Sequence, residues 1–208
     1  MSYNYLINME PILINSAKTA ASKMTNSNAY PAFPEKLDTR TFKHNLEFGF
    51  IALIMACTYV ETCLNTMCRA LFNSTSEDLR TGNAKDKIEK ILSPSSIRIK
   101  ELKASKTWSD YMICLDLRND FVHYKSNFSY DPNSVYGRGS IRKGKGGKVD
   151  IVKFFTRNNM EEHIDNLSRL IQELAEIKDL KINESISPVI PDVSDKAHDY
   201  ICKTTSNS

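Results

Sequence analysis

The amino-acid sequence predicts an all-α protein, an up-down bundle of four to five main helices with one short, basic, β-hairpin-like insertion. In three segments the apolar residues recur at steps of three and four residues, the spacing that gives a helix a continuous packing face. The clearest segment begins near Thr41 and contains Leu46, Phe50, Leu53, Cys57, Val60, Leu64, Met67 and Leu71. The second lies within 108–128 and contains Ile113, Leu117, Phe121, Tyr124 and Phe128. The third begins near Arg157 and contains Met160, Ile164, Leu167, Ile171 and Leu174.

The remaining segments are expected to be shorter helices and loops. Residues 3–24 are weakly helical, and Pro11 within them predicts a boundary or a kink. Residues 26–34 are rich in Asn, Ser and Pro without apolar periodicity, which predicts a loop. Two short helices separated by Pro94 are expected at 84–92 and near 96–104.

Length and composition fit one globular domain. The chain has 208 residues, of which 41% are hydrophobic and 25% charged, and this is enough to bury a substantial core. We expect a single helical domain over residues 1–186, with its core at about 42–180, followed by a loosely held tail over 187–208. The net charge of +3 is too small to indicate a polyanionic partner by itself.

The sequence favours the cytoplasm and gives no sign of a membrane anchor. The N-terminus lacks the basic and apolar regions of a signal peptide, and the longest charge-free apolar run, 48–60, is too short to span a bilayer. The five cysteines form no C-x-x-C pair, which favours reduced thiols. Cys57, Cys63 and Cys68 are scattered around one helix, so we expect apolar core residues and neither a metal site nor another cofactor.

A basic, glycine-rich insertion occupies about 130–152. Five of the seven glycines fall there, and no acidic residue occurs between Asp131 and Asp150. A G-x-x-x-x-G-K match is present, but Gly146 stands where a phosphate-binding loop needs Ser or Thr. The segment predicts a hairpin that contacts RNA phosphates without reading sequence, or else a solvated hairpin without a partner. The expected RNA-binding residues are Arg138, Arg142, Lys143, Lys145 and Lys148.

The strongest candidate for chemistry is the set Arg118, Asn119 and His123 on the helix within 108–128. A neutral imidazole can take or give a proton near pH 7, and a guanidinium can bind a phosphate and stabilise its developing charge. Asp116 shares the polar stripe of Asn119 and His123. Glu61 either pairs with Arg118 or reaches solvent at its helix edge. On residue types alone, an amphipathic helix with purely structural hydrogen bonds explains the set as well.

A resemblance to a known family adds to this interpretation. A late helix bearing Arg118-Asn119-x-x-x-His123, in an all-α chain, resembles the R-x4-6-H motif of the HEPN domain family. The segments Leu-Asp-Leu at 115–117 and Tyr-Val-Glu-Thr-Cys-Leu-Asn at 59–65 also look like that family's core, so the resemblance spans about 42–180. One sub-lineage of toxins has Tyr two residues after the His, whereas here Tyr124 follows directly.

The resemblance implies a homodimeric, metal-independent endoribonuclease, as in toxin–antitoxin or antiviral defence systems. His123 would be the general acid and base, Arg118 the phosphate binder and Asn119 a polar support, with Glu61, Asp116 and Tyr124 assisting. An antitoxin or regulatory protein is a further expected partner. The alternative is a non-catalytic module of the same family that binds RNA or protein. In either case Leu115 and Val122 are expected to face the second copy.

Overall fold

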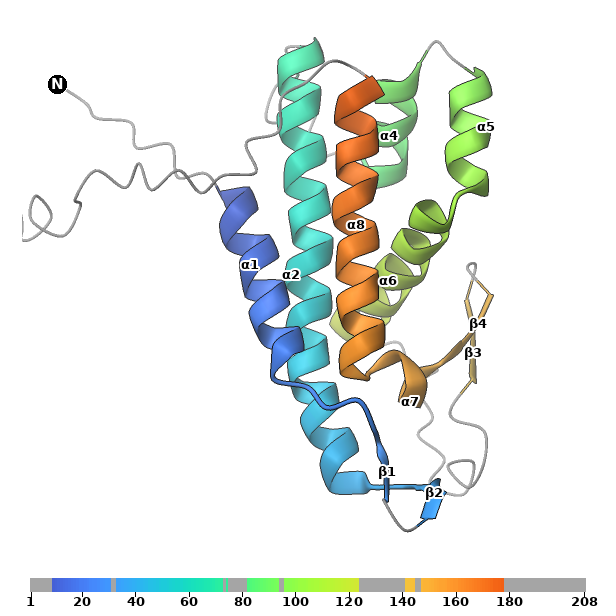
Figure 1. Ribbon diagram of the computed structural model, residues 1–208. Helices are drawn as coiled ribbons and strands as arrows, with labels where there is room; N and C mark the ends of the chain where they lie inside the picture. Colours follow the sequence, from blue (N-terminus) through green and yellow to red (C-terminus); the bar gives the residue numbers. More distant parts are fainter. Residues whose placement is uncertain are drawn as a thin grey trace, which may run out of the picture.

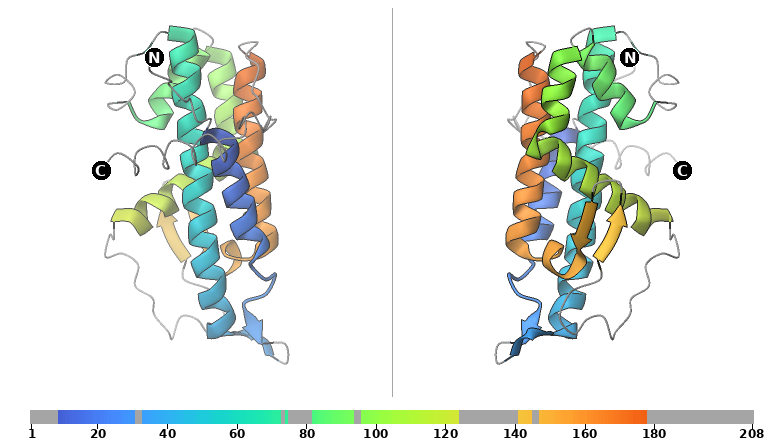
Figure 2. Two further views of the ribbon diagram at one scale, coloured as in Figure 1. Left: turned by 90° about the vertical axis from the view of Figure 1, so that its left-hand side faces the viewer. Right: turned by 90° about the vertical axis from the view of Figure 1, so that its right-hand side faces the viewer.

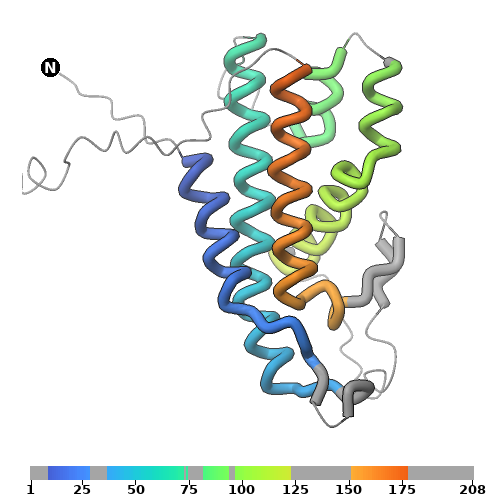
Figure 3. Tube along the Cα trace, viewed as in Figure 1, coloured from blue at the N-terminus to red at the C-terminus, as the bar shows by residue number. Residues whose placement is uncertain are grey.

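The computed structural model describes residues 9–30, 33–72, 74, 82–93, 96–123, 141–144 and 147–177. Within them, residues 29–30, 33–36, 96, 123, 141–144 and 147–150 are described by their backbone alone. Figure 3 traces the chain through its helices in sequence colours.

The described chain is predominantly helical, which confirms the predicted all-α class. The helices are α1 (Met9–Ser22), α2 (Thr39–Phe72), α4 (Ala84–Leu92), α5 (Ser96–Ala104), α6 (Lys106–His123), α7 (Ile151–Phe154) and α8 (Arg157–Ile177). Two short antiparallel pairs accompany them, β1 (Ala29–Tyr30) with β2 (Phe33–Leu37), and β3 (Ile141–Gly144) with β4 (Gly147–Asp150). The short helices α4 and α5 and the start of α8 lie where the sequence predicts them.

The long helix α2 is the centre of the packing. It contacts α1, α8, α6 and α4, while α8 also contacts α1 and α6. Helices α1, α2 and α8 run side by side, whereas α6 is inclined to them (Figures 1 and 2). Helix α6 therefore lies against both α2 and α8, and its residues divide between these two neighbours.

The predicted packing faces of α2 and α8 form the core. On α2, residues Leu53, Cys57, Val60, Leu64 and Met67 are buried. On α8, all of the predicted face is buried, namely Met160, Ile164, Leu167, Ile171 and Leu174. On α6, Leu117 is fully buried, while Ile113 and Phe121 are half-buried against the same core. Tyr124 and Phe128 lie outside the described residues.

Helix α2 also has the length and composition of a membrane-spanning helix. Its most apolar stretch is 44% buried within the protein, and the core helix of a soluble protein meets the same criterion. The criterion therefore does not decide between the two kinds of helix.

The prediction of a loop over 26–34 holds for 26–28 and is wrong for 29–30 and 33–34, which lie in β1 and β2. Ala29 pairs with Leu37 and Tyr30 with Phe33, so the chain forms a short β-ladder there. Strands this short do not show an alternation of apolar and polar residues, and the two prolines favoured the prediction of a loop. Pro11 marks a helix boundary, as predicted, because α1 begins at Met9 and places Pro11 in its first turn, where the missing N–H costs nothing.

A buried amide cluster joins the β1 segment to α2 and α7. The Asn45 side chain, fully buried, donates to the Thr25 carbonyl (3.1 Å) and the Asn28 Oδ1 (2.7 Å), and its Oδ1 accepts from the Thr25 N–H (2.8 Å). Asn28 donates in turn to the carbonyls of Val152 (2.6 Å) and Phe155 (3.1 Å). Since α7 directly follows β4, this cluster anchors the C-terminal end of the basic insertion to α2.

Gly49 is expected to be intolerant of a side chain. A Cβ there would collide with the Phe155 ring and lie 3.0 Å from the Met24 Cε. Phe155 is itself fully buried and in edge contact with Phe121 and Phe154, so it cannot yield. Gly49→Ala should therefore lower the free energy of unfolding by about 1–2 kcal/mol, despite the better helix propensity of alanine.

Urea unfolding of the Gly49→Ala variant would measure this effect. Glu47→Ala, at an exposed position of the same helix, is the matched control and should be near neutral. Equal stability of Gly49→Ala and the wild type would contradict the packing described here.

Candidate active site

The helix that bears the predicted site begins at a defined cap. The Ser105 hydroxyl accepts the N–H of Trp108 (3.2 Å), which fixes the first turn of α6. Trp108, Tyr111, Cys114 and Leu117 then face the interior. Arg118 and Asn119 follow at the edge of this buried face and are both half-buried.

Arg118 is paired with Glu61 of α2. The Arg118 Nη2 lies 3.3 Å from the Glu61 Oε2, and the two side chains are 24% and 32% exposed. Of the two alternatives for Glu61, the structure has the ion pair with Arg118. A distance of 3.3 Å is long for a charge-assisted hydrogen bond, and only one oxygen takes part, so the pair is not a bidentate clamp.

Asn119 accepts a hydrogen bond from the other terminal nitrogen of the guanidinium. The Arg118 Nη1 donates to the Asn119 Oδ1 at 2.9 Å. The structure thus brings together three of the predicted residues, Glu61, Arg118 and Asn119. A guanidinium has five N–H donors, so these two contacts leave donors over for a phosphate.

Buried groups lie behind this pair. Burial raises the pKa of the Cys57 thiol to about 12, against the opposing effect of the Arg118 charge. Burial likewise raises the pKa of the Tyr111 hydroxyl, with Cys57 and Glu61 adding to the effect. Tyr111 is fully buried, and its hydroxyl has no hydrogen-bond partner among the described residues. Both groups therefore stay protonated at neutral pH, and neither is a nucleophile.

The other predicted site residues are less fully placed. His123 is the last residue of α6, five residues after Arg118, and only its backbone is described. Asp116 is half-buried and takes part in neither Arg118 contact.

The remaining predicted residues follow α6 in the chain. Three of them lie outside the described residues, namely Tyr124, Arg138 and Lys145. Arg142 and Lys143 are in β3 and Lys148 is in β4, each described by its backbone.

The two residues expected to face a second copy differ in exposure. Val122 is 50% exposed, one residue before His123. Leu115 is half-buried and packs against the core of its own chain. Of these two residues, Val122 is thus the one exposed at the surface.

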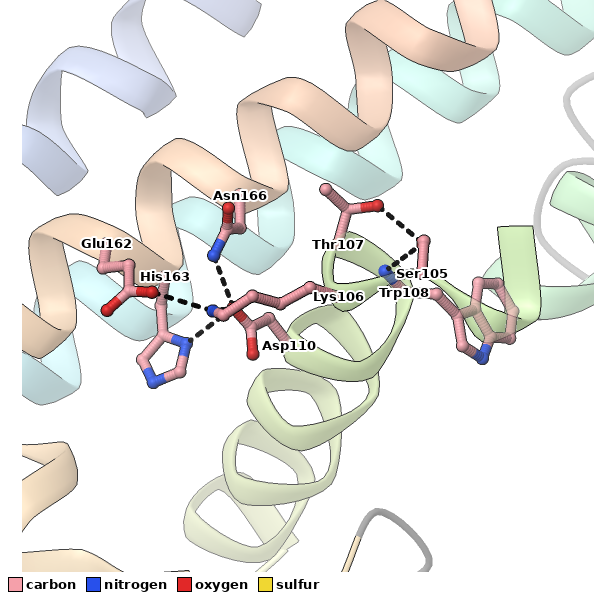
Figure 4. A network of polar contacts seen from close by, with 8 residues as sticks. All are labelled: Ser105, Lys106, Thr107, Trp108, Asp110, Glu162, His163 and Asn166. Carbon is pink, nitrogen blue, oxygen red and sulfur yellow. Dashed lines mark hydrogen bonds and ion pairs between the residues drawn. The ribbon is translucent and has the colours of Figure 1, made fainter. Parts of the chain in front are cut away.

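A second polar cluster, which the sequence reasoning missed, joins α6 to α8 (Figure 4). Its centre is Asp110, whose Oδ2 accepts from the Lys106 Nζ (2.6 Å) and the Asn166 Nδ2 (2.5 Å). The His163 Nδ1 lies 3.6 Å from the same oxygen, and its ring stacks on Phe154 with centroids 4.5 Å apart. His163 therefore belongs to this cluster at the contact between α6 and α8.

Electrostatics keep Asp110 ionised although it is only 6% exposed. Burial alone would raise its pKa, but His163, Lys106 and Asn166 together hold that pKa well below its usual range. The lysine also pairs with the exposed Glu162 at 2.8 Å. A signal for this cluster was present in the sequence. Asp110 precedes Cys114 and Leu117 at helical spacing, so it occupies a core-facing position where an unpaired carboxylate would be costly.

Comparisons of the chain with family models, with curated proteins and with solved structures found no match. In the part of the chain that the structure describes, no group of three Cys, His, Asp or Glu side chains is arranged to hold a metal ion. The candidate site thus consists of Arg118, bound by Glu61 and Asn119, with His123 at the end of the same helix.

Proposed function

We propose that this protein is a metal-independent endoribonuclease of the HEPN type. The observation that supports this most directly is the anchoring of Arg118 by Glu61 and Asn119 on α6, five residues before His123. Five residues are about 7.5 Å of helix, within the span of an arginine side chain and one phosphodiester. The proposed fold is the up-down helical bundle of that family, with the β3–β4 hairpin as an insertion.

The proposed reaction uses the nucleophile of RNA itself. The His123 imidazole takes the proton of a ribose 2′-hydroxyl, whose oxygen then forms a bond to the adjacent phosphorus. The bond from phosphorus to the 5′-oxygen breaks, and an imidazolium protonates that leaving oxygen. The products are a 2′,3′-cyclic phosphate and a 5′-hydroxyl. Arg118 stabilises the charge that develops on the non-bridging oxygens.

A homodimer would place two such motifs in one cleft, with one histidine as base and the other as acid. The exposed side chain of Val122 beside His123 supports an interface at this end of α6. The basic residues of the 130–152 insertion are proposed to bind RNA phosphates outside the cleft. Asn28 binds the carbonyl of Val152, at the C-terminal end of this insertion. We place the protein in the cytoplasm, as a toxin or antiviral effector under the control of an antitoxin or a regulatory protein.

A second candidate function is a non-catalytic module that binds RNA or protein through the same surface. The observation in its favour is that Glu61 already compensates the charge of Arg118, as in a purely structural ion pair. It predicts that His123→Ala leaves partner binding unchanged. Expression in a bacterium separates the two functions, because a nuclease should slow growth in a His123-dependent manner.

Cleavage of RNA in EDTA tests the proposal. Purified protein would be incubated with total RNA or tRNA beside the Arg118→Ala and His123→Ala variants. We expect the wild type alone to cut, to leave 2′,3′-cyclic phosphate ends and to spare an oligonucleotide of the same sequence made of DNA. If the wild type cuts no better than the variants, the protein is not a nuclease of this type.

A further inference from the structure

The ion pair between Glu61 and Arg118 is weak enough for a phosphate to replace the carboxylate. It is monodentate and 3.3 Å long, and both side chains retain contact with solvent. Pairs of this kind contribute about 1 kcal/mol or less. A phosphate offers a guanidinium two parallel hydrogen bonds and a larger negative charge, so it competes well for the same nitrogens.

A carboxylate that loses its arginine needs another hydrogen-bond donor. The hydroxyl of Tyr111 is a candidate donor, because it is buried, has no partner among the described residues, and feels the charges of both Glu61 and Arg118. Tyr111 lies seven residues before Arg118, which is two turns and therefore the same side of α6. Helical side chains lean toward the N-terminus of their helix, so the guanidinium of Arg118 leans toward the turn that carries Tyr111.

From these contacts we infer that Glu61 is a gate on Arg118, meaning that its carboxylate occupies the guanidinium until a nucleic acid binds. The incoming phosphate displaces the Glu61 carboxylate from Arg118. The displaced carboxylate then accepts a hydrogen bond from the Tyr111 hydroxyl. In the closed state, Glu61 neutralises the arginine and the tyrosine hydroxyl is left unsatisfied. In the open state, the phosphate binds Arg118, and the Tyr111 O–H donates to Glu61. The unsatisfied hydroxyl thus raises the free energy of the closed state and lowers the cost of opening. This inference rests on the proposed role of Arg118 as a phosphate binder.

Binding of a non-cleavable oligonucleotide tests the gate without any dependence on catalysis. The probe is a fluorescent single-stranded RNA with 2′-O-methyl groups at every position, and the readout is anisotropy. The isosteric Glu61→Gln variant should bind about fivefold more tightly, since the closed state loses its ion pair. Asp116→Asn is the matched control, because it removes one negative charge two residues from Arg118 without touching the pair.

Three comparisons between variants, in oligonucleotide binding and in Tm, test the gate. The gain from Glu61→Gln should exceed that of Asp116→Asn and should vanish in an Arg118→Ala background. Tyr111→Phe should weaken oligonucleotide binding in the wild type but not in Glu61→Gln. It should also leave the Tm unchanged or raise it, because it removes an unsatisfied buried hydroxyl. Replacement of a merely structural tyrosine would not weaken binding without also lowering the Tm.

Weaker binding by Glu61→Gln would overturn the gate and make Glu61 a positioning residue for Arg118. A gain equal to that of Asp116→Asn, or one that persists without Arg118, would overturn it as well. If the binding results hold and the protein nevertheless cuts no RNA, the gate stands and the endoribonuclease proposal alone fails.

Discussion

Replacement of His123 by alanine is expected to lower the rate of RNA cleavage by about 10²–10⁴-fold, the usual contribution of a positioned acid or base. His123 is the last residue of α6, so the helix does not depend on it and the Tm of the variant should equal that of the wild type. Single-turnover cleavage of a defined RNA, beside thermal unfolding, would measure both quantities. A loss of activity with a matching loss of stability would not count as support.

Two substitutions of Arg118 distinguish the contribution of its positive charge from that of its planar donor geometry. Arg118→Ala should lose about 10²–10³-fold in cleavage, as for the removal of one transition-state donor. Arg118→Lys keeps the positive charge but loses the planar, two-pronged donor, and it should remain nearly as impaired as the alanine variant. Activity of the lysine variant close to that of the wild type would mean that Arg118 acts as a point charge and not as a bidentate phosphate binder.

Asp110→Ala should lower the free energy of unfolding by about 2–4 kcal/mol. The change leaves the buried Nδ2 of Asn166 without its acceptor and removes the shared partner of Lys106 and His163. For a chain of this size, that corresponds to a fall in Tm of roughly 5–10 °C. Glu162→Ala is the matched control, since it removes an exposed carboxylate from the same lysine and should cost less than about 1 kcal/mol.

The contribution of Asp110 is also expected to depend on pH. Its pKa is lower in the folded protein than the usual value of about 3.9, so the folded state favours the ionised form. The resulting stability is fully present above about pH 4 and is lost as the pH falls further, toward the folded pKa. The difference in unfolding free energy between the wild type and Asp110→Asn should therefore shrink as the pH falls below 4. Urea unfolding at pH 3 and pH 7 would show whether it does.

The helices were predictable because their apolar spacing reports directly on burial. The alternation of four and three along α2 and α8 corresponds to side chains such as Leu53, Leu64, Leu167 and Leu174, which are buried in the structure. The β1–β2 ladder was not predictable, because its strands are too short for alternation and depend on Asn28 and Asn45, which are distant in sequence. Similarly, no local pattern indicates that Gly49 must leave room for Phe155.

The candidate site was also predictable only where local spacing carries the information. The pair between Glu61 and Arg118 was one of two open alternatives, because spacing places both residues near the α2–α6 contact but does not say which way a long side chain turns. The cluster around Asp110 was missed because its partners His163 and Asn166 lie on a helix more than fifty residues away. A charged residue at a core-facing helical position was the available signal, and it identifies a need for partners without identifying them.

The amide of Asn28 has a consequence for the order in which the protein folds. Its two acceptors, the carbonyls of Val152 and Phe155, lie 124 and 127 residues away along the chain. Contacts between such distant residues carry a large loop-closure cost and form once nearer contacts have reduced the search. The amide cluster should therefore close after α8 has docked on α2. A nascent chain that ends before α7 would then carry Asn28 without its final acceptors, so the β1–β2 segment should stay sensitive to proteolysis until Val152 and Phe155 are in place.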